Sequence, residues 1–204
     1  MSHHSGAPDT LTDALQEQVQ ALLPQLQCRK CGYIDCAAYA TALADGRAPI
    51  NRCSPGGDWT IMRLAALLDQ PVTAIDPACP AHRAGRVFID ETECIGCARC
   101  LPACPVAAII GMPRLLHAVL AEDCTGCELC IPTCPVDCIH WTSSDPSAQP
   151  WQGWTLPQAA RAQAQYRRRK QAARETAQAT DRLRRRREIQ EAVERVRRRR
   201  LAKR

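Results

Sequence analysis

The sequence predicts an α+β fold made of small cysteine-rich modules that end in a long basic tail. A dense cysteine pattern occurs twice, and each copy has a short β-like segment before it and a short helix-like segment after its cysteines. The chain holds 14 cysteines but only one Phe, three Tyr and four Trp among 204 residues, so small stapled modules are expected instead of one large core. After Pro157 the chain has no Gly and no Pro, and its Ala, Gln, Arg and Glu residues favour helix.

The N-terminal segment, residues 1–27, contains a stretch with the periodicity of an amphipathic helix. Its apolar residues recur at near-helical spacing: Leu15, Val19, Leu22, Leu23 and Leu26. The segment lacks the basic start and apolar stretch of a secretory signal, and no window of the chain approaches the ~18 apolar residues of a transmembrane helix. We therefore expect a cytosolic protein whose cysteines bind metal instead of forming disulfides.

Residues 28–70 hold four cysteines at the spacing C-x2-C-x4-C-x16-C. They are Cys28, Cys31, Cys36 and Cys53. Four thiolates suit a structural zinc site, but the cysteine-rich repeat further along the chain makes a single [4Fe–4S] cluster the simpler interpretation.

Two short helices are predicted around this quartet. The first covers Ala37–Asp45 and ends at Gly46, because glycine favours the left-handed turn after a helix. The second covers residues 59–69 with Asp58 as its N-cap. We expect the N-terminus of this second helix to face the quartet, where its free N–H groups would stabilise anionic sulfur.

After a linker at residues 71–85, residues 86–142 contain the repeat C-x2-C-x2-C-x3-C-P. Its copies begin at Cys94 and Cys124 and share nine of seventeen positions. Structural zinc sites usually take two well-separated pairs of ligands. Here three thiolates fall within seven residues and a fourth follows at once, which suits a cubane iron–sulfur cluster. Residues 86–90 and 115–121 are the β-like segments that precede the copies.

The proline after the fourth cysteine of each copy turns the chain away, so that cysteine is expected to reach the cluster of the other copy. We assign one [4Fe–4S] cluster to Cys94, Cys97, Cys100 and Cys134, and another to Cys124, Cys127, Cys130 and Cys104. With the N-terminal quartet, twelve cysteines hold three [4Fe–4S] clusters. Cys79 and Cys138 are left without a metal, and His117 and His140 are interpreted as ordinary packing or surface residues.

Charge divides the chain into an acidic body and a basic tail. Residues 1–157 hold 9 Lys+Arg against 16 Asp+Glu, a net charge of −7, whereas residues 158–204 hold 18 against 5, a net charge of +13. A linker at residues 143–157 joins them. The tail is predicted to be helical or partly disordered, with three supporting i,i+4 pairs: Asp181–Arg185, Glu191–Arg195 and Glu194–Arg198. An anionic membrane surface or an acidic partner subunit is the favoured target, and nucleic acid is the less expected one.

The order of modules over about residues 20–142 resembles the B subunit of the Rnf-type (Rsx) membrane electron-transport complex. The resemblance rests on the stretch "LLPQLQCRKCGYIDCAAYATALADGRAPINRCSPGG" and on two copies joined by "GMPRLLHAVLAEDC". The copies themselves are similar to the bacterial two-[4Fe–4S] ferredoxin fold. Family members usually begin with a transmembrane anchor and stop soon after the ferredoxin module, whereas this chain shows no anchor and continues into the tail.

The resemblance implies an electron-transfer subunit that relays electrons through three [4Fe–4S] clusters, within a membrane-bound complex coupling electron transfer to ion translocation. It implies other subunits and redox donor and acceptor proteins as partners, and a peripheral place at the cytoplasmic face of the bacterial inner membrane. The chain itself shows no nucleophile–base pair or phosphate-binding glycine loop, so no substrate site of its own is expected. Two alternatives stay open: a free-standing soluble ferredoxin, and a nucleic-acid-binding iron–sulfur protein that acts through its tail.

Overall fold

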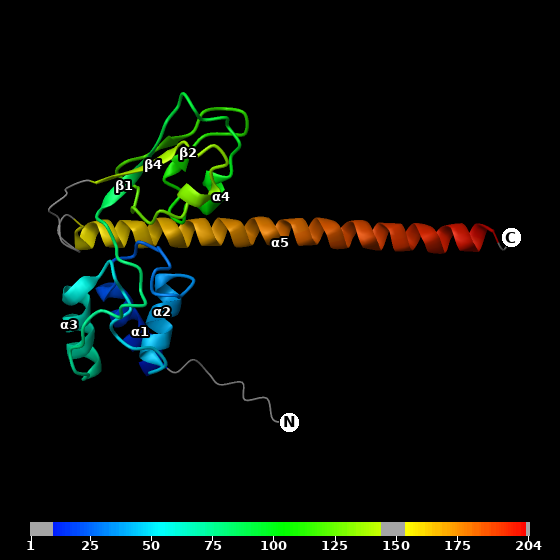
Figure 1. Ribbon diagram of the computed structural model, residues 1–204. Helices are drawn as coiled ribbons and strands as arrows, with labels where there is room; N and C mark the ends of the chain where they lie inside the picture. The colour runs from blue at the N-terminus through cyan, green and yellow to red at the C-terminus, as the bar shows by residue number, and fades with distance from the viewer. Residues whose placement is uncertain (1–9, 144–153, 203–204) are drawn as a thin grey trace. The chain divides into compact units, whose positions relative to one another are not determined.

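The computed structural model describes residues 10–143 and 154–202 of the 204-residue chain. These residues form helices and short strands, which confirms the predicted α+β class (Figure 1). The chain divides into two compact units, Met1–Tyr166 and Arg167–Arg204. Most of the predicted linker at 143–157 lies outside the described residues.

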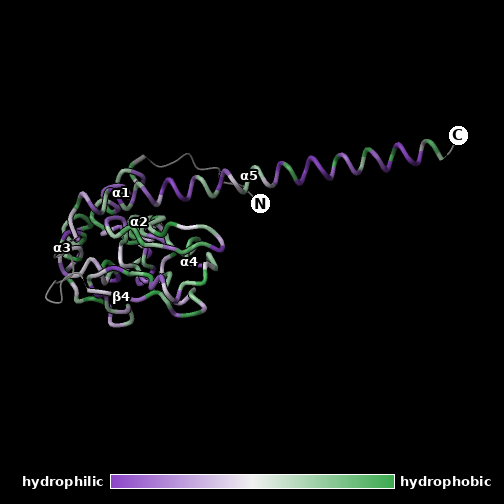
Figure 2. The backbone as a smooth tube through the Cα atoms, turned by 90° about the horizontal axis from the view of Figure 1, so that it is seen from above, coloured by the Kyte–Doolittle hydropathy of each residue, from purple (hydrophilic) through white to green (hydrophobic). Residues whose placement is uncertain are grey.

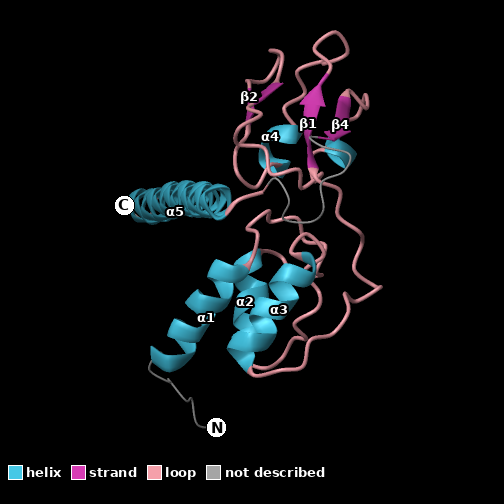
Figure 3. Ribbon diagram, turned by 90° about the vertical axis from the view of Figure 1, so that its left-hand side faces the viewer, coloured by secondary structure: helices cyan, strands magenta, loops and turns pink. Residues whose placement is uncertain are grey.

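Three helices make up the N-terminal part of the first unit: α1 (Thr10–Leu22), α2 (Cys36–Ala44) and α3 (Gly57–Leu68). They pack against one another, as Figure 3 shows. Their shared core is apolar and fully buried: Val19, Leu23, Tyr39, Leu43, Ile61 and Leu64. The predicted helix before the quartet is therefore confirmed, but it ends at Leu22, and the buried Leu23 and Leu26 lie beyond its end.

The ends of α2 and α3 show how the chain around the quartet is shaped. Asp35 caps α2, because its carboxylate accepts a hydrogen bond from the Ala38 N–H at 2.7 Å. The prediction that Asp58 caps the next helix is wrong. The turn at Gly56 brings the Gly57 N–H to the Cys53 carbonyl at 3.1 Å, so α3 starts at Gly57 and Asp58 lies in its first turn.

The repeat forms two small antiparallel sheets. The first joins β1 (Gly85–Ile89) to β4 (Ile139–Ser143), and the second joins β2 (Ile109–Ile110) to β3 (Ala118–Val119). β1 and β2 belong to the first copy, β3 and β4 to the second. Each strand therefore pairs with a strand of the other copy, and neither copy has a sheet of its own.

A cysteine loop and one helical turn lie between the strands of each copy. These turns are α4 (Cys100–Ala103) and η1 (Ile131–Thr133). Each ends at a cysteine with extended backbone, Cys104 or Cys134, because the proline that follows disfavours helical geometry. The predicted β-like segment 115–121 is mostly irregular, and only Ala118–Val119 pair as a strand.

The tail is helical, as predicted. Helix α5 runs from Leu156 to Leu201, and its first turns belong to the first unit. Ion pairs form on its surface between Arg185 and Asp181 at 2.8 Å and between Arg198 and Glu194 at 2.9 Å, whereas Glu191 pairs with Arg187 at 3.0 Å. Beyond its first turns the helix is hydrophilic with scattered apolar residues and has no apolar face (Figure 2). Over residues 10–143 and 154–202, no helix combines the length and apolar character needed to cross a bilayer.

Candidate metal centres

Three hollows in the first unit are each lined by one of the predicted groups of four cysteines, and Cys138 also lines the second hollow. Site 1 has about 320 Å³ of empty space and is lined by Cys28, Cys31, Cys36 and Cys53. Site 2 has about 270 Å³ and is lined by Cys94, Cys97, Cys100 and Cys134. Site 3 has about 290 Å³ and is lined by Cys104, Cys124, Cys127 and Cys130. The fold thus brings together the same three groups of four that the spacings predict.

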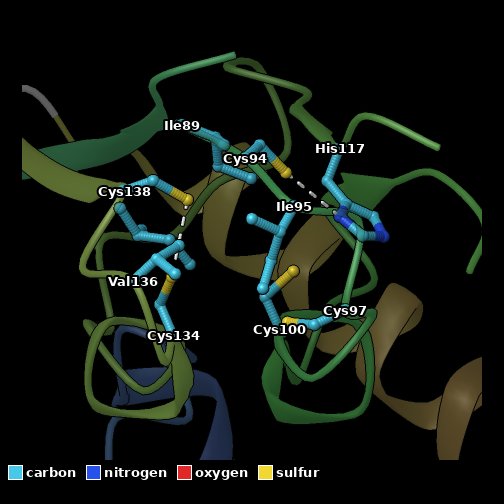
Figure 4. A pocket seen from close by; sticks show the side chains of 10 residues that line it. Ile89, Cys94, Ile95, Cys97, Cys100, His117, Cys134, Val136 and Cys138 are labelled. Atoms are coloured by element: carbon cyan, nitrogen blue, oxygen red, sulfur yellow. Dashed lines mark hydrogen bonds between the residues drawn. The ribbon is translucent and has the colours of Figure 1, made fainter. Parts of the chain in front are cut away.

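Sites 2 and 3 each take three cysteines from one copy of the repeat and one from the other. Cys134 leaves the second copy and lies with the first three cysteines of the first copy (Figure 4). Cys104 makes the reverse exchange. The copies therefore exchange cysteines as well as strand partners. The exchanges of Cys104 and Cys134 both follow from the extended backbone at the Cys–Pro steps.

Two glycines shape the cysteine loops. Gly96 and Gly126 have φ angles of +66° and +64°, which side chains rarely tolerate. A Cβ on Gly96 would lie 2.8 Å from the Leu115 carbonyl oxygen, and one on Gly126 would meet the Gly85 carbonyl oxygen. Neighbouring backbone is therefore a sufficient reason for glycine at both positions.

Site 1 lies among the ends of helices. Cys53 is 6 % exposed, and a Cβ on Gly56 at the N-terminus of α3 would be 3.1 Å from its Sγ. The N-terminal turn of α3 thus adjoins a candidate ligand, as predicted. The Cys36 N–H donates to Oε1 of the buried Gln27 at 3.0 Å, which holds the start of α2 against the chain before Cys28.

Seven of the twelve cluster-site thiols are hard to ionise without a metal, whereas hydrogen bonds from neighbouring backbone and from Cys138 lower the pKa of Cys134. Burial raises the pKa of Cys127 to about 11 and that of Cys130 to about 12, from an ordinary value of 9.0. Burial likewise raises the pKa of five more cluster-site thiols: Cys28, Cys31, Cys36, Cys53 and Cys100. Metals and iron–sulfur clusters bind thiolates, so filling these sites must release protons.

Site 1 adjoins site 3. The Thr125 hydroxyl, between two site 3 cysteines, donates to the Leu26 carbonyl at 3.1 Å. The Lys30 ammonium, between two site 1 cysteines, pairs with the Glu128 carboxylate at 3.4 Å. These contacts connect the loop of site 1 to the loop of the second copy, so site 3 lies next to site 1 through its own cysteine loop.

The first turns of α5 make contacts beside both site 1 and site 3. The Tyr166 hydroxyl donates to the Asp35 carboxylate at 2.7 Å, beside the site 1 cysteine at the start of α2. Arg161 pairs with Asp123 at 2.6 Å, beside the first cysteine of site 3. Ala162 is 2 % exposed, and its small side chain lets the helix pack closely against the ferredoxin core. One helix therefore contacts both cysteine modules.

The sequence interpretation gave His117 no place at a cluster site and expected Cys138 only to pack near a cluster as a small apolar residue. Nδ1 of His117 lies 3.6 Å from Sγ of Cys94, and His117 is 1 % exposed. Sγ of Cys138 lies 3.4 Å from Sγ of Cys134. Aligning the two copies at their offset of thirty residues would have placed both beside a cluster site. Cys79 is buried but lines none of the three hollows.

The donor sets fit iron–sulfur clusters. A single zinc ion draws its sulfur ligands to about 2.3 Å from one point. Within residues 10–143 and 154–202, no three His, Cys, Asp or Glu side chains converge closely enough to hold one metal ion. Four thiols around a hollow, three of them at C-x2-C-x2-C spacing in sites 2 and 3, are the donors that a [4Fe–4S] cluster requires.

Comparison with known proteins agrees with this geometry. The family model for a 4Fe-4S dicluster domain matches residues 87–141, and one for an Fe-S cluster matches residues 23–55. The B subunit of the ion-translocating oxidoreductase complex from Ectopseudomonas mendocina is 50% identical over 150 residues, which cover 72% of this chain and 76% of that protein. The chain belongs to the family of B subunits of ion-translocating oxidoreductase complexes.

Other B subunits support the same membership. The one from Alkalilimnicola ehrlichii is 49% identical over 146 residues, covering 71% of this chain and 78% of that protein. The one from Yersinia pestis bv. Antiqua (strain Antiqua) is 48% identical over 114 residues, covering 54% and 60%. No solved structure matches the chain. As a member of this family with a 4Fe-4S dicluster domain, the chain is an iron–sulfur electron-transport protein.

Proposed function

We propose that the chain is the electron-transfer subunit of a membrane-bound, ion-translocating oxidoreductase complex, and that twelve of its fourteen cysteines hold three [4Fe–4S] clusters. The observation that carries the proposal is the grouping of these cysteines around three separate hollows. A bound [4Fe–4S] cluster supplies reversible one-electron transfer. The chain supplies the ligands, the apolar residues that limit water and the contacts that fix the sites.

Iron content tests the cluster count directly. Anaerobically purified full-length protein should hold about twelve irons and as many acid-labile sulfides. Replacing Cys31 by alanine should remove about four irons, whereas Cys79→Ser, a change at a cysteine that lines no site, should remove none. About eight irons and one zinc would show that site 1 binds zinc and would refute the three-cluster proposal.

We further propose that the sites act in the order 1, 3, 2. Contacts of Lys30 and Leu26 with the loop of site 3 support the first step, and the exchanged cysteines support the second. Site 2 then lies at the exposed end, where Cys97 reaches the surface. Emptying site 3 should remove the spin–spin broadening that its cluster causes in the EPR signals of sites 1 and 2. Unchanged broadening of these signals would refute the order.

The basic tail is proposed to dock on an anionic membrane surface at the cytoplasmic face of the inner membrane. Residues 167–204 hold 17 Lys+Arg against 5 Asp+Glu, a net charge of +12. Each basic residue near an anionic bilayer contributes about 1 kcal/mol. Such binding needs charge and no apolar face, which matches the character of α5.

Vesicle flotation tests this docking. The full chain should float with vesicles that contain phosphatidylglycerol and stay unbound with purely zwitterionic ones. The matched truncation ends after Tyr166, because Ala159, Ala162 and Tyr166 pack in the first unit and must be kept. Equal flotation of both chains would refute the lipid proposal, and tight salt-dependent binding to DNA instead would favour the nucleic-acid alternative.

A further inference from the structure

The internal repeat makes site 3 a built-in reference for site 2. Residues thirty positions apart occupy the same place around the two hollows. Both hollows are lined by equivalent cysteines and by equivalent apolar residues: Ile89 with Val119, Val136 with Val106, and Ile139 with Ile109. Because these are alike, the few positions that differ must account for any difference between the two clusters.

One difference places a buried imidazole at site 2. His117 lines site 2, whereas Val87 occupies the equivalent place at site 3. Nδ1 of His117 faces Sγ of Cys94 at 3.6 Å (Figure 4). Nε2 is buried and finds no hydrogen-bond partner among the described residues. A thiolate that binds a cluster can only accept, so with the proposed cluster in place the ring carries its hydrogen on Nδ1 and donates it to the sulfur.

The ring has little freedom to leave this position. A Cβ on Gly111 would meet Cδ2 of His117, so the glycine lets the backbone lie directly against the imidazole. His117 is also only 1 % exposed, so its side chain does not face solvent. The donor is thus held in place by packing.

A second difference adds a thiol to the same site. Cys138 lines site 2, whereas its equivalent at site 3 is Ala108. Sγ of Cys138 lies 3.4 Å from Sγ of Cys134, and the residue is 3 % exposed. At site 3 the contact to Cys104 comes from backbone, because the Ala108 N–H donates to its Sγ at 3.2 Å. Site 2 therefore has two side-chain donors that its equivalent lacks.

A third difference concerns exposure. Ile95 at site 2 is 61 % exposed, whereas its equivalent Thr125 at site 3 is 3 % exposed. The Thr125 hydroxyl donates to the Leu26 carbonyl at 3.1 Å and is, among the described residues, the one side-chain hydrogen-bond partner of the Cys127 sulfur at site 3. Site 2 thus has more sulfur donors and more water nearby than site 3.

Reduction adds a negative charge to a cluster, and both hydrogen bonds to sulfur and access of water stabilise that charge. Resting on the proposed presence of a [4Fe–4S] cluster in each site, we propose that His117 and Cys138 raise the reduction potential of site 2 above that of site 3. A single electron shared by the two sites then settles at site 2. These two residues position donors and act on the cluster through its cysteines.

Reductive titration of the full chain, followed by EPR, tests the proposal. The signals are assigned with Cys97→Ala, which empties site 2, and Cys127→Ala, which empties site 3. In the unaltered protein the electron should favour site 2 by at least tenfold, which corresponds to about 59 mV for a one-electron couple. His117→Val with Cys138→Ala, which copies the environment of site 3, should reduce this preference by at least tenfold.

His117→Asn is the matched control, because its amide retains an N–H donor and should keep most of the preference. A preference for site 3 in the unaltered protein, or an unchanged preference in the double variant, would overturn the proposal. Cys138→Ala alone provides a smaller change if the double variant does not fold, and it should lower the potential of site 2 without altering that of site 3. An iron count below about eight for sites 2 and 3 together would instead contradict the proposed clusters themselves.

Discussion

The last cysteines of the two copies, Cys104 and Cys134, should respond differently to replacement by alanine. Each lines the site built mainly by the other copy. Beside Cys134, however, a spare thiol is available, because Sγ of Cys138 lies only 3.4 Å from its Sγ. The equivalent of Cys138 in the first copy is Ala108, so Cys104 has no substitute.

The iron content expected for each variant follows from these distances. Cys104→Ala should leave about eight of about twelve irons, with site 3 lost. Cys134→Ala should keep about twelve, because Cys138 can take over as the fourth ligand after a small shift of the chain. The double change Cys134→Ala with Cys138→Ala should leave about eight, with site 2 lost.

Anaerobic iron and sulfide analysis measures these numbers, and EPR of the reduced protein identifies the remaining sites. Cys138→Ala alone is the control and should keep about twelve irons. Equal iron loss in Cys104→Ala and Cys134→Ala would falsify the idea that Cys138 can replace Cys134 as a ligand. Loss of the site 2 signal in Cys104→Ala would contradict the exchange of ligands between copies.

Three further predictions concern stability and site 1. Tyr166→Phe removes a hydrogen bond to the Asp35 carboxylate and should cost about 1.5 kcal/mol, lowering the melting temperature by about 3–6 °C. Gly56→Ala would push a methyl group to 3.1 Å from Sγ of Cys53 and into the Thr60 side chain, so iron at site 1 should fall. The metal-free protein should lose stability above about pH 9, because thiols with a raised pKa, such as Cys127 and Cys130, ionise when unfolded but stay protonated when folded.

Each of these has a matched control. Tyr33→Phe should barely change the melting temperature, because within the described residues its ring contacts Tyr39 and its hydroxyl has no hydrogen bond. Gly46→Ala should cost about 1–2 kcal/mol through its φ of +66° yet keep all the iron, since open space surrounds it. Metal-loaded protein should show no comparable loss above about pH 9, and a metal-free protein equally stable at about pH 8 and about pH 10.5 would contradict the raised pKa values.

The cysteine spacings predict the groups at the three sites because each spacing is local and a cluster admits few alternatives. The Cys–Pro steps even predict the exchange of Cys104 and Cys134. By contrast, the contact of Tyr166 with Asp35 spans 131 residues, and nothing in the composition of the tail indicates it. Because α5 has no apolar face, its sequence has no hydrophobic periodicity that would predict packing of its first turns.

The predictions for His117 and Asp58 failed for local reasons. His117 looked ordinary because a lone histidine in a β-like stretch is usually a packing residue. The structure places it in the lining of site 2, equivalent to Val87 in the lining of site 3. Asp58 has the residue type of an N-cap, but glycine at Gly56 and Gly57 allowed the helix to begin earlier.

The exchange between copies also sets when the sites can be completed during synthesis. With the proposed ligands, Cys94, Cys97 and Cys100 emerge from the ribosome long before the fourth ligand of their site. Site 3 becomes complete with Cys130, and site 2 with Cys134 four residues later. At about 5–20 residues per second, both become ready for cluster insertion within about a second of each other. A ribosome that stalls between the copies therefore yields no finished ferredoxin centre, and the two centres mature together.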